Sequence, residues 1–207
     1  MLFRSDHSSA RIERYLQLAA QDNMWIVQPS TPANHFHMLR TQAYKRPRKP
    51  LIAFTPKQLL RLSAAASHID EFTSGSFQPV IGDTTITDPS AVTRVLLCTG
   101  RLYYDLAKER AHRGDTSTAI IRLEQLYPLP EAELAEALAQ YPNATVTWVQ
   151  DEPRNQGAWP HLALNLFPSL GRPVRLVSRP ESATTAAGRA SLHKEQAATL
   201  IAQAFEG

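Results

Sequence analysis

Residues 92–114 read VTRVLLCTGRLYYDLAKERAHRG, a strand followed directly by a helix. The first part is a short, nearly continuous apolar run that ends at Gly100, which is typical of a strand buried on both faces of a sheet. The second part reads as a helix and ends at Gly114, a residue that readily takes the left-handed conformation found after a last helical turn. A strand joined directly to a helix is the repeating unit of parallel sheets.

The same strand–helix unit recurs three more times toward the C-terminus. Further strands are expected at residues 118–126, 144–150 and 173–178, and further helices at 130–142, 157–167 and 191–205. Four consecutive units predict an α/β fold, with a parallel sheet, helices on both faces and right-handed crossovers. Ligands of such sheets bind at the carboxyl ends of the strands. Those ends carry CTGR, EQLYP, QDEPRNQGAW and SRPESATTAAG.

The residues before this regular part predict a second, shorter α/β unit. Strands are expected at residues 24–29 and 50–56, and helices at 10–20 and 30–44. Thr31 and Pro32 suit the N-cap and the first position of the second of these helices. Phe36, Leu39 and Ala43 form its apolar face. Residues 66–90 show no clean period and are rich in Gly, Ser, Thr, Asp and Pro, which indicates an extended linker between two domains.

Composition excludes several classes of protein. The 207 residues carry a net charge of +3, which is too little for a dedicated nucleic-acid binder. No apolar run approaches the roughly 18 residues of a membrane span. The basic run KRPRKP (residues 45–50) is interpreted as a solvated loop in preference to a phosphate-binding patch. The single cysteine, Cys98, allows no disulfide within the chain and suits a reducing compartment, so we expect a cytoplasmic protein.

The motifs of common nucleotide-binding and hydrolytic enzymes are missing from the sequence, which has no G-x-G-x-x-G, Walker A or G-x-S-x-G pattern. His35 and His37 stand two apart on a predicted helix and face different ways. No histidine or carboxylate cluster has metal-ligand spacing, so we expect no metal site in this chain. Ser8 and Ser9, next to His7, favour capping of the first helix over nucleophilic catalysis, because the members of a catalytic triad come from distant segments.

Two interpretations stay open for the polar loop DEPRNQGAW, residues 151–159. Polar loops at strand ends often carry function, so the loop can belong to an active site or to a subunit interface. Equally, it can be a turn that supplies an N-cap, with Trp159 docking the following helix.

Seven motifs, in order, closely resemble the C-terminal part of the thiamine-diphosphate-dependent dehydrogenase component of the 2-oxoglutarate dehydrogenase complex. They are DHSSARIERYLQLAAQDNM, PSTPANHFHMLR, RPRKPLIAFTPKQLLR, LLCTGRLYYDL, IIRLEQLYPLP, WVQDEPRNQGAW and SRPESATTAAG. The resemblance runs from about Asp6 to the end of the chain. It implies that residues 1–61 are the closing stretch of a pyrimidine-binding α/β domain, residues 62–84 a linker, and residues 85–207 a transketolase-type C-terminal domain.

The resemblance also implies a chemistry. Family members act as homodimers that hold thiamine diphosphate between the chains, decarboxylate 2-oxoglutarate and pass the succinyl group to a lipoyl group on the succinyltransferase component. The histidine of the family's H-S-S-A-R motif lies in the active site, and the matching residue is His7, the one catalytic residue that we expect here. An imidazole at that position can bind a substrate oxygen or shuttle a proton near neutral pH.

The sequence departs from the family pattern before His7. It lacks the G-D-G…N signature that binds the diphosphate and magnesium, and MLFRS stands where the family has a glycine-rich run. We therefore expect a fragment that binds neither thiamine diphosphate nor magnesium by itself and is inactive alone. The alternative is a non-catalytic interaction module that pairs with a separately encoded N-terminal chain or with itself. Neither reading includes a nucleic-acid or membrane partner.

Some actinobacterial relatives bind acetyl-CoA as an activator through Thr, Arg, Lys, Ser, Gln and two Arg residues. The matching residues of this chain are Trp25, Thr41, Ser76, Pro79, Gln125, Ala132 and Glu133. Only the glutamine is retained, and the loss of the cations leaves nothing to pair with the phosphates. We expect no control by acetyl-CoA.

Overall fold

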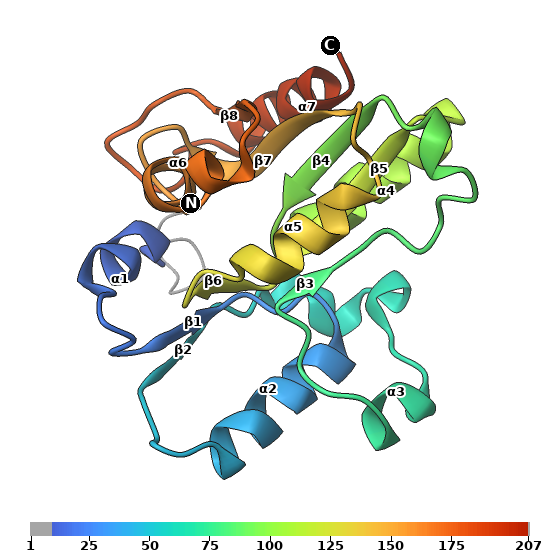
Figure 1. The fold of residues 1–207 in the computed structure, drawn as a ribbon. Helices are drawn as coiled ribbons and strands as arrows, with labels where there is room; N and C mark the ends of the chain where they lie inside the picture. Colours follow the sequence, from blue (N-terminus) through green and yellow to red (C-terminus); the bar gives the residue numbers. More distant parts are fainter. Residues whose placement is uncertain (1–9, 207) are drawn as a thin grey trace.

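The computed structural model describes residues 10–206 and contains two sheets. The larger has five strands in the order β3-β5-β4-β7-β8, and the smaller has three in the order β2-β1-β6 (Figure 1). The fold is therefore α/β, as the strand–helix pattern predicts.

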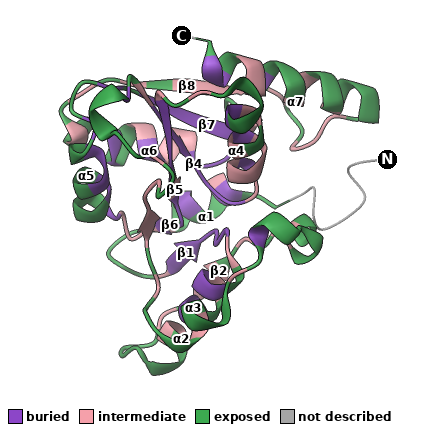
Figure 2. Cartoon of the chain, turned by 90° about the vertical axis from the view of Figure 1, so that its right-hand side faces the viewer, coloured by how far each residue is buried: buried purple, intermediate pink, exposed green. Residues whose placement is uncertain are grey.

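The predicted parallel strands form the larger sheet. They are β4 (Arg94–Cys98), β5 (Thr118–Leu123), β7 (Thr145–Pro153) and β8 (Val174–Arg179). β4 lies at the centre and pairs in parallel with β5 on one side and β7 on the other, while β8 extends the sheet beyond β7. The inner strands are almost completely buried, which explains their continuous apolar sequences (Figure 2).

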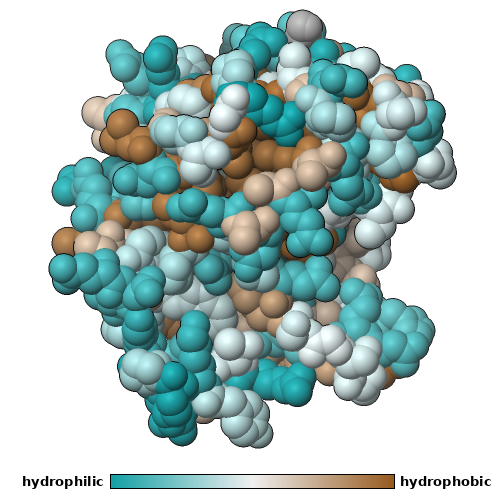
Figure 3. Space-filling model, viewed as in Figure 1, coloured by the Kyte–Doolittle hydropathy of each residue, from teal (hydrophilic) through white to brown (hydrophobic). Residues whose placement is uncertain are grey.

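Helices cover both faces of the larger sheet, as expected. α4 (Leu102–Arg113) and α7 (Ala190–Phe205) pack on one face through Leu106 and Leu200. α5 (Glu131–Ala139) and α6 (Trp159–Asn165) pack on the other through Leu134 and Leu162. The face of the molecule shown in Figure 3 is mostly polar, with apolar residues gathered in its upper half.

The predicted end of α4 is confirmed. Gly114 follows the last turn with φ +60°, and its N–H donates to the carbonyls of Arg110 and Ala111. A left-handed glycine thus closes the helix and satisfies carbonyls that the helix itself leaves free.

The smaller sheet joins the two parts of the chain. β1 (Trp25–Val27) pairs in parallel with β2 (Leu51–Ala53) and antiparallel with β6 (Gln125–Tyr127). The single strand expected at residues 118–126 is therefore wrong, because the chain leaves the larger sheet after Leu123 and enters the smaller one at Gln125. Glu124, between them, is fully buried. The packing partner on each side, and not the local sequence, decides where this apolar run divides.

The segment at residues 66–90, interpreted above as an extended linker, contains regular structure. It includes α3 (Ile69–Thr73), β3 (Val80–Ile81) and a 3-10 turn, η4 (Pro89–Ala91), and follows η2 (Lys57–Arg61) and η3 (Ser63–Ala65). β3 pairs antiparallel with β5, so the sheet is not wholly parallel. A two-residue strand is too short to produce a periodic pattern.

The helix α2 (Pro32–Tyr44) begins as predicted but buries a different face. Thr31 Oγ1 accepts a hydrogen bond from Asn34 N at 3.1 Å, and Pro32 takes the first helical position. Phe36 and Leu39 are 43% and 51% exposed, whereas the buried side chains are those of Ala33, Asn34, His37 and Met38. The apolar face of Phe36, Leu39 and Ala43 thus points toward solvent, because polar contacts with the segment after η3 hold the other face inward.

The remaining helix, α1 (Ile12–Leu18), lies against α6, with Ile12 and Leu16 in the core beside the larger sheet. A further 3-10 segment, η5 (Phe167–Leu170), follows α6. Of the helices between residues 10 and 206, none is long and apolar enough to span a bilayer.

Candidate functional site

The carboxyl ends of β4 and β7 form the position where a ligand of an open α/β sheet usually binds. From β4 the chain passes through α4 to β5 on one side, and from β5 through α5 to β7 on the opposite side. The direction of the sheet order thus reverses at β4, and ligands of open α/β sheets bind beside such a point. Arg101 follows β4, and Asp151 and Glu152 lie in the last part of β7.

Ion pairs link the ends of three strands at this edge of the sheet. Asp151 Oδ1 accepts from Arg179 Nη2 at 2.9 Å, and Asp151 Oδ2 lies 3.5 Å from Arg101 Nη2. Arg101 also pairs with Asp105 in the first turn of α4. Arg179 is 7% exposed, so its charge requires the neighbouring carboxylate. The network fixes the carboxyl ends of β4, β7 and β8 relative to one another.

Glu152, the neighbour of Asp151, is the carboxyl group most changed by this surrounding. Burial, with a smaller effect from the charge of Asp151, raises the pKa of Glu152 to about 7. A carboxyl group with such a pKa can give or take a proton near neutral pH.

The loop after β7 is built around Gln150, which is 1% exposed. Its Oε1 accepts from Trp148 Nε1 and from the backbone N–H of Trp159, each at 3.0 Å. Its Nε2 donates to the carbonyls of Pro153 and Gln156, at 3.1 and 2.8 Å. One amide side chain therefore sets the path of the loop.

The same loop holds α1. Gly157 N donates to Glu13 Oε2 at 3.0 Å, across 144 positions of sequence. A small cavity of about 200 Å³ lies beside this contact and is lined by Glu13, Asn155 and His161, among others. Burial lowers the pKa of His161 below its ordinary value and thus favours the neutral imidazole. The start of α1 is thereby fastened to the carboxyl end of the larger sheet.

The structure answers part of the question left open for residues 151–159. The N-cap of α6 is Ala158, which offers no side-chain cap, so the N-cap interpretation is wrong. Trp159 does dock the helix, since it packs against the core beside the larger sheet, with its ring centroid 5.8 Å from that of Phe167. Asp151 and Glu152 remain the residues of this loop that could bind a ligand or transfer a proton.

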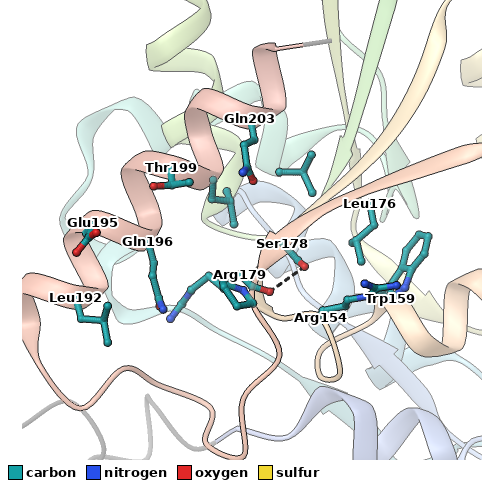
Figure 4. Close-up of a pocket in the computed structure, with 13 residues that line it drawn as sticks. Arg154, Trp159, Leu176, Ser178, Arg179, Leu192, Glu195, Gln196, Thr199 and Gln203 are labelled. Atoms are coloured by element: carbon teal, nitrogen blue, oxygen red, sulfur yellow. Dashed lines mark hydrogen bonds between the residues drawn. The ribbon is translucent and has the colours of Figure 1, made fainter.

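A larger hollow of about 630 Å³ opens between the edge strand β8 and α7 (Figure 4). Arg154, Trp159 and Arg179 line one side, and Gln196, Thr199 and Gln203 of α7 line the other. Leu176 and Val177 give it an apolar floor.

The remaining candidate residues lie apart from this site. His7, Ser8 and Ser9 fall outside the described residues. His37 is buried, with Nε2 2.7 Å from the Glu71 carbonyl, and His35 lies on another side of α2. The basic run at 45–50 forms a mostly exposed turn after α2. Gln125 is the glutamine retained from the residues that bind acetyl-CoA in some relatives. Its Oε1 accepts a hydrogen bond from Trp25 Nε1 at 2.6 Å, and its Nε2 donates to the Pro128 carbonyl.

Metal ligation finds no support in the described part of the chain. Between residues 10 and 206, no three His, Cys, Asp or Glu side chains gather in a way that could hold a metal ion.

Sequence reasoning missed Glu124, the most deeply buried charged residue of the junction between the sheets. Its Oε2 accepts from Ser30 N at 2.7 Å and from Asn34 Nδ2 at 3.0 Å. The sequence did contain a signal for it, namely a single glutamate inside the apolar run TAIIRLEQL. Because an acidic side chain is rarely buried without partners, this position predicts a buried carboxylate with hydrogen-bond donors around it.

Two family models match the chain in succession. The model described as transketolase, pyrimidine binding domain, matches residues 5–63, and the model described as 2-oxoglutarate dehydrogenase C-terminal matches residues 66–205.

Curated relatives match almost the whole chain. A 2-oxoglutarate dehydrogenase E1/E2 component of Corynebacterium glutamicum is 49% identical over 207 residues, which is 97% of this chain and 17% of the relative. An E1 component of Haemophilus influenzae is 46% identical over 203 residues, 97% of this chain and 22% of the relative. A multifunctional 2-oxoglutarate metabolism enzyme of Mycolicibacterium vanbaalenii is 44% identical over 208 residues, again 97% and 17%.

The chain thus spans about a fifth of the length of these relatives. The match to the C-terminal model, by contrast, covers more than half of the chain and includes every strand of the larger sheet. The chain belongs to the 2-oxoglutarate dehydrogenase C-terminal family.

Proposed function

We propose that this chain serves as the C-terminal part of a 2-oxoglutarate dehydrogenase E1 component, which decarboxylates 2-oxoglutarate and transfers the succinyl group to a lipoyl group of its partner component. The observation that carries the proposal is the match of two successive domains, with 44–49% identity to relatives over 97% of the chain. We divide the chain at residues 1–61, 62–84 and 85–207.

Thiamine diphosphate, with magnesium, supplies the carbanion chemistry in this proposal, and both bind residues that this chain does not contain. The chain's own contribution is to complete the pyrimidine-binding domain and to hold the segment that carries His7. We assign His7 the role of binding a substrate oxygen or moving a proton there.

The contact of Glu13 with Gly157 supports this assignment. His7 precedes α1 by five residues, and α1 is fastened by Glu13 to the loop that follows β7. The carboxyl end of the larger sheet, with Asp151 and Glu152, is the site to which this fastening ties α1. Two parts of the chain separated by more than a hundred residues therefore share one location.

The test is reconstitution. The chain is co-expressed with the N-terminal part of a related E1 component, and decarboxylation of 2-oxoglutarate is measured with thiamine diphosphate and magnesium present. We expect activity from the assembled pair, as a homodimer of the two-chain unit, and none from the chain alone. His7→Gln is expected to lower kcat by about 10²–10⁴, the usual effect of removing an acid–base group. Activity of the chain alone would contradict the proposal, as would an unaffected His7→Gln variant.

A second candidate function is a non-catalytic interaction module. The exposed apolar residues of α2 and its neighbours favour it, since Phe36, Leu39 and Tyr44 are 43%, 51% and 80% exposed. A stable complex of the chain with itself or with the N-terminal part, but without restored activity, selects this function over the first.

A further inference from the structure

The outer edge of β8 has no neighbouring strand in the described part of the chain. Among residues 10–206, β8 pairs with β7 on one side only and ends the larger sheet. A strand in this position leaves backbone N–H and C=O groups that no ladder hydrogen bond uses. Pro173 and Pro180 stand immediately before and after the strand and cannot donate to a ladder, so the open edge is six residues long.

The hollow of about 630 Å³ between β8 and α7 follows this edge. Leu176 and Val177 both line it, although neighbouring residues of a strand point to opposite faces of the sheet. Leu176 packs against the core that contains Leu162 of α6, and Val177 packs against the core that contains Leu200 of α7. A space that touches both side chains therefore lies along the edge of β8 and not over one face of the sheet.

The two sides of this hollow, which we call the β8 groove, differ in chemistry (Figure 4). The α7 side presents polar side chains, among them Thr199 and Gln203. The other side combines the apolar Leu176 and Trp159 with Arg154. Because side chains of an extended chain alternate, a strand added beside β8 would turn every second side chain to each of these sides.

The charge along this edge is positive and mostly unpaired. Arg154 and Arg175 are exposed, and their side chains form no ion pair or hydrogen bond with another residue between 10 and 206. Arg179 is paired with Asp151. Glu195, on the α7 side, forms an ion pair with none of these arginines. The free arginine charges favour an acidic occupant, and they oppose a second β8 edge, because such pairing would bring the arginines of two copies together.

We propose that the β8 groove binds an extended acidic peptide, which adds to the larger sheet as a further strand beside β8. The peptide backbone pairs with the open edge, and one face of the peptide presents an acidic side chain to Arg154 and an apolar one to Leu176 and Trp159. The opposite face presents polar side chains to α7. Main-chain hydrogen bonds supply affinity in this mode of recognition, and alternate side chains supply selectivity.

A fluorescein-labelled synthetic peptide, TETVTET, tests the proposal. Its glutamates and valine share one face of an extended chain and its threonines share the other. The sequence reads the same in both directions, so either orientation brings a glutamate to the Arg154 end of the groove. We expect saturable binding to the full chain by fluorescence anisotropy, and binding about tenfold weaker for TKTVTKT. Equal binding of the two peptides, or no binding of either, would overturn the proposal.

Methylation of the peptide nitrogens tests the pairing with the strand edge. The N–H groups of alternate residues in an extended chain point to opposite sides, so only one alternate set can face β8. One peptide therefore carries N-methyl groups on the glutamates and the valine, and a second carries them on the threonines. We expect one of the two to lose binding and the other to retain it. Retention by both would show that the side chains alone are recognised, which contradicts a strand addition.

Variants of the groove locate the binding. Thr199→Trp places an indole in the groove, and we expect the affinity for TETVTET to fall about tenfold. Ala198→Trp is the matched control, since Ala198 is also an exposed residue of α7 but does not line the groove. Arg154→Gln should weaken binding about threefold, the size of an exposed ion pair, whereas Arg61→Gln, an exposed arginine of η2, should have no effect.

Equal affinities for Thr199→Trp and Ala198→Trp would place the peptide elsewhere and refute the assignment. Sedimentation of the chain without peptide covers the other occupant of such an edge. A dimer that Thr199→Trp dissociates and Ala198→Trp does not, with no binding of TETVTET, would assign the groove to a second copy of the chain and overturn the proposal.

Discussion

At the carboxyl end of the larger sheet, Gly157 contributes as much as the polar contacts to the position of the neighbouring residues. Gly157 has φ +69°, and a Cβ atom there would lie 2.9 Å from the Cβ of Glu152. Its N–H is also the donor that fastens α1 through Glu13. The position of Glu152 and the attachment of α1 therefore depend on one residue without a side chain.

Gly157→Ala tests this dependence. We expect a loss of about 2–3 kcal/mol in the free energy of unfolding, from the left-handed backbone and the collision with Glu152 together. Gly171→Ala isolates the backbone effect, since Gly171 has φ +65° but open space around it, and is expected to cost about 1 kcal/mol. Urea unfolding measures both variants. Equal losses in the two would show that Gly157 and Glu152 are not in tight contact.

Glu152 also predicts a dependence of stability on pH. Its pKa rises from 4.5 to about 7 on folding, so the folded protein loses stability as pH increases between these values. Glu152→Gln should leave stability unchanged at pH 4.5 and add about 1–2 kcal/mol at pH 8. Unfolding free energies across this range give the measurement, with the exposed Glu136→Gln as control. A gain that is the same at both pH values is incompatible with a raised pKa.

Helices and strands were predictable from the sequence where a run of apolar residues packs against a single sheet. The four strand–helix units, the Thr31 N-cap and Gly114 followed from local rules, because their partners lie within the same unit. The division of residues 118–126 into β5 and β6 did not, since the two halves of one apolar run enter different sheets. Likewise, the i, i+3, i+7 pattern of α2 marked an apolar face, but Asn34 and His37 on the opposite face are the residues that find buried partners.

The connecting segment between α3 and β4 shows how a polar residue can fix an element that has no periodicity. Asp83, with its side chain 1% exposed, pairs with Arg110 of α4 and accepts from Ile120 N of β5 at 2.7 Å. Burial acts to raise the pKa of Asp83, but hydrogen bonds from Arg110, Thr85 and Ile120 prevail and lower it. A single carboxylate thus anchors the segment to a helix and a strand.

Asp83→Ala should therefore destabilise the protein by about 3–5 kcal/mol, because it leaves the buried Arg110 without its counter-ion. Asp88→Ala is the matched control, since Asp88 forms the same type of turn with Ser90 but is exposed. We expect less than about 1 kcal/mol from the control, the usual size of a lost cap. Thermal or urea unfolding decides, and similar losses for the two aspartates would refute the anchoring role.

At the scale of the whole molecule, the shortest crossing of the chain between the two sheets is the step from β5 to β6. β5 and β6 are consecutive in sequence but belong to different sheets, and Glu124 between them contacts Ser30 and Asn34 of the first part. The site residues that the sequence suggested lie in separate segments, and this crossing and the Glu13–Gly157 contact are among the long-range contacts that set their mutual position. Neither contact has a local sequence signature, because each joins residues about a hundred positions apart.

Glu124 should make the union of the two parts sensitive to pH. Burial raises its pKa above the ordinary 4.5, against the opposing effect of hydrogen bonds from Ser30 and Asn34. A raised pKa in the folded state means that the stabilising contribution is complete below pH 4.5 and is lost as pH rises through the folded value. Glu124→Gln keeps an oxygen that can accept from Ser30 N and Asn34 Nδ2, but carries no charge to desolvate.

The stability of Glu124→Gln relative to the unaltered protein should therefore increase with pH. We expect equal free energies of unfolding at pH 4.5 and a higher free energy of unfolding for the variant at pH 8. Calorimetry should show one transition for both proteins, since the crossing joins the two sheets in a single cooperative unit. Glu124→Ala is the contrasting variant: it removes the acceptor as well, and should cost about 2–3 kcal/mol at every pH, because Ser30 N and Asn34 Nδ2 are left buried without a partner. If Glu124→Gln is as destabilising as Glu124→Ala at pH 8, the charged carboxylate, and not the hydrogen-bond acceptor, holds the two sheets together.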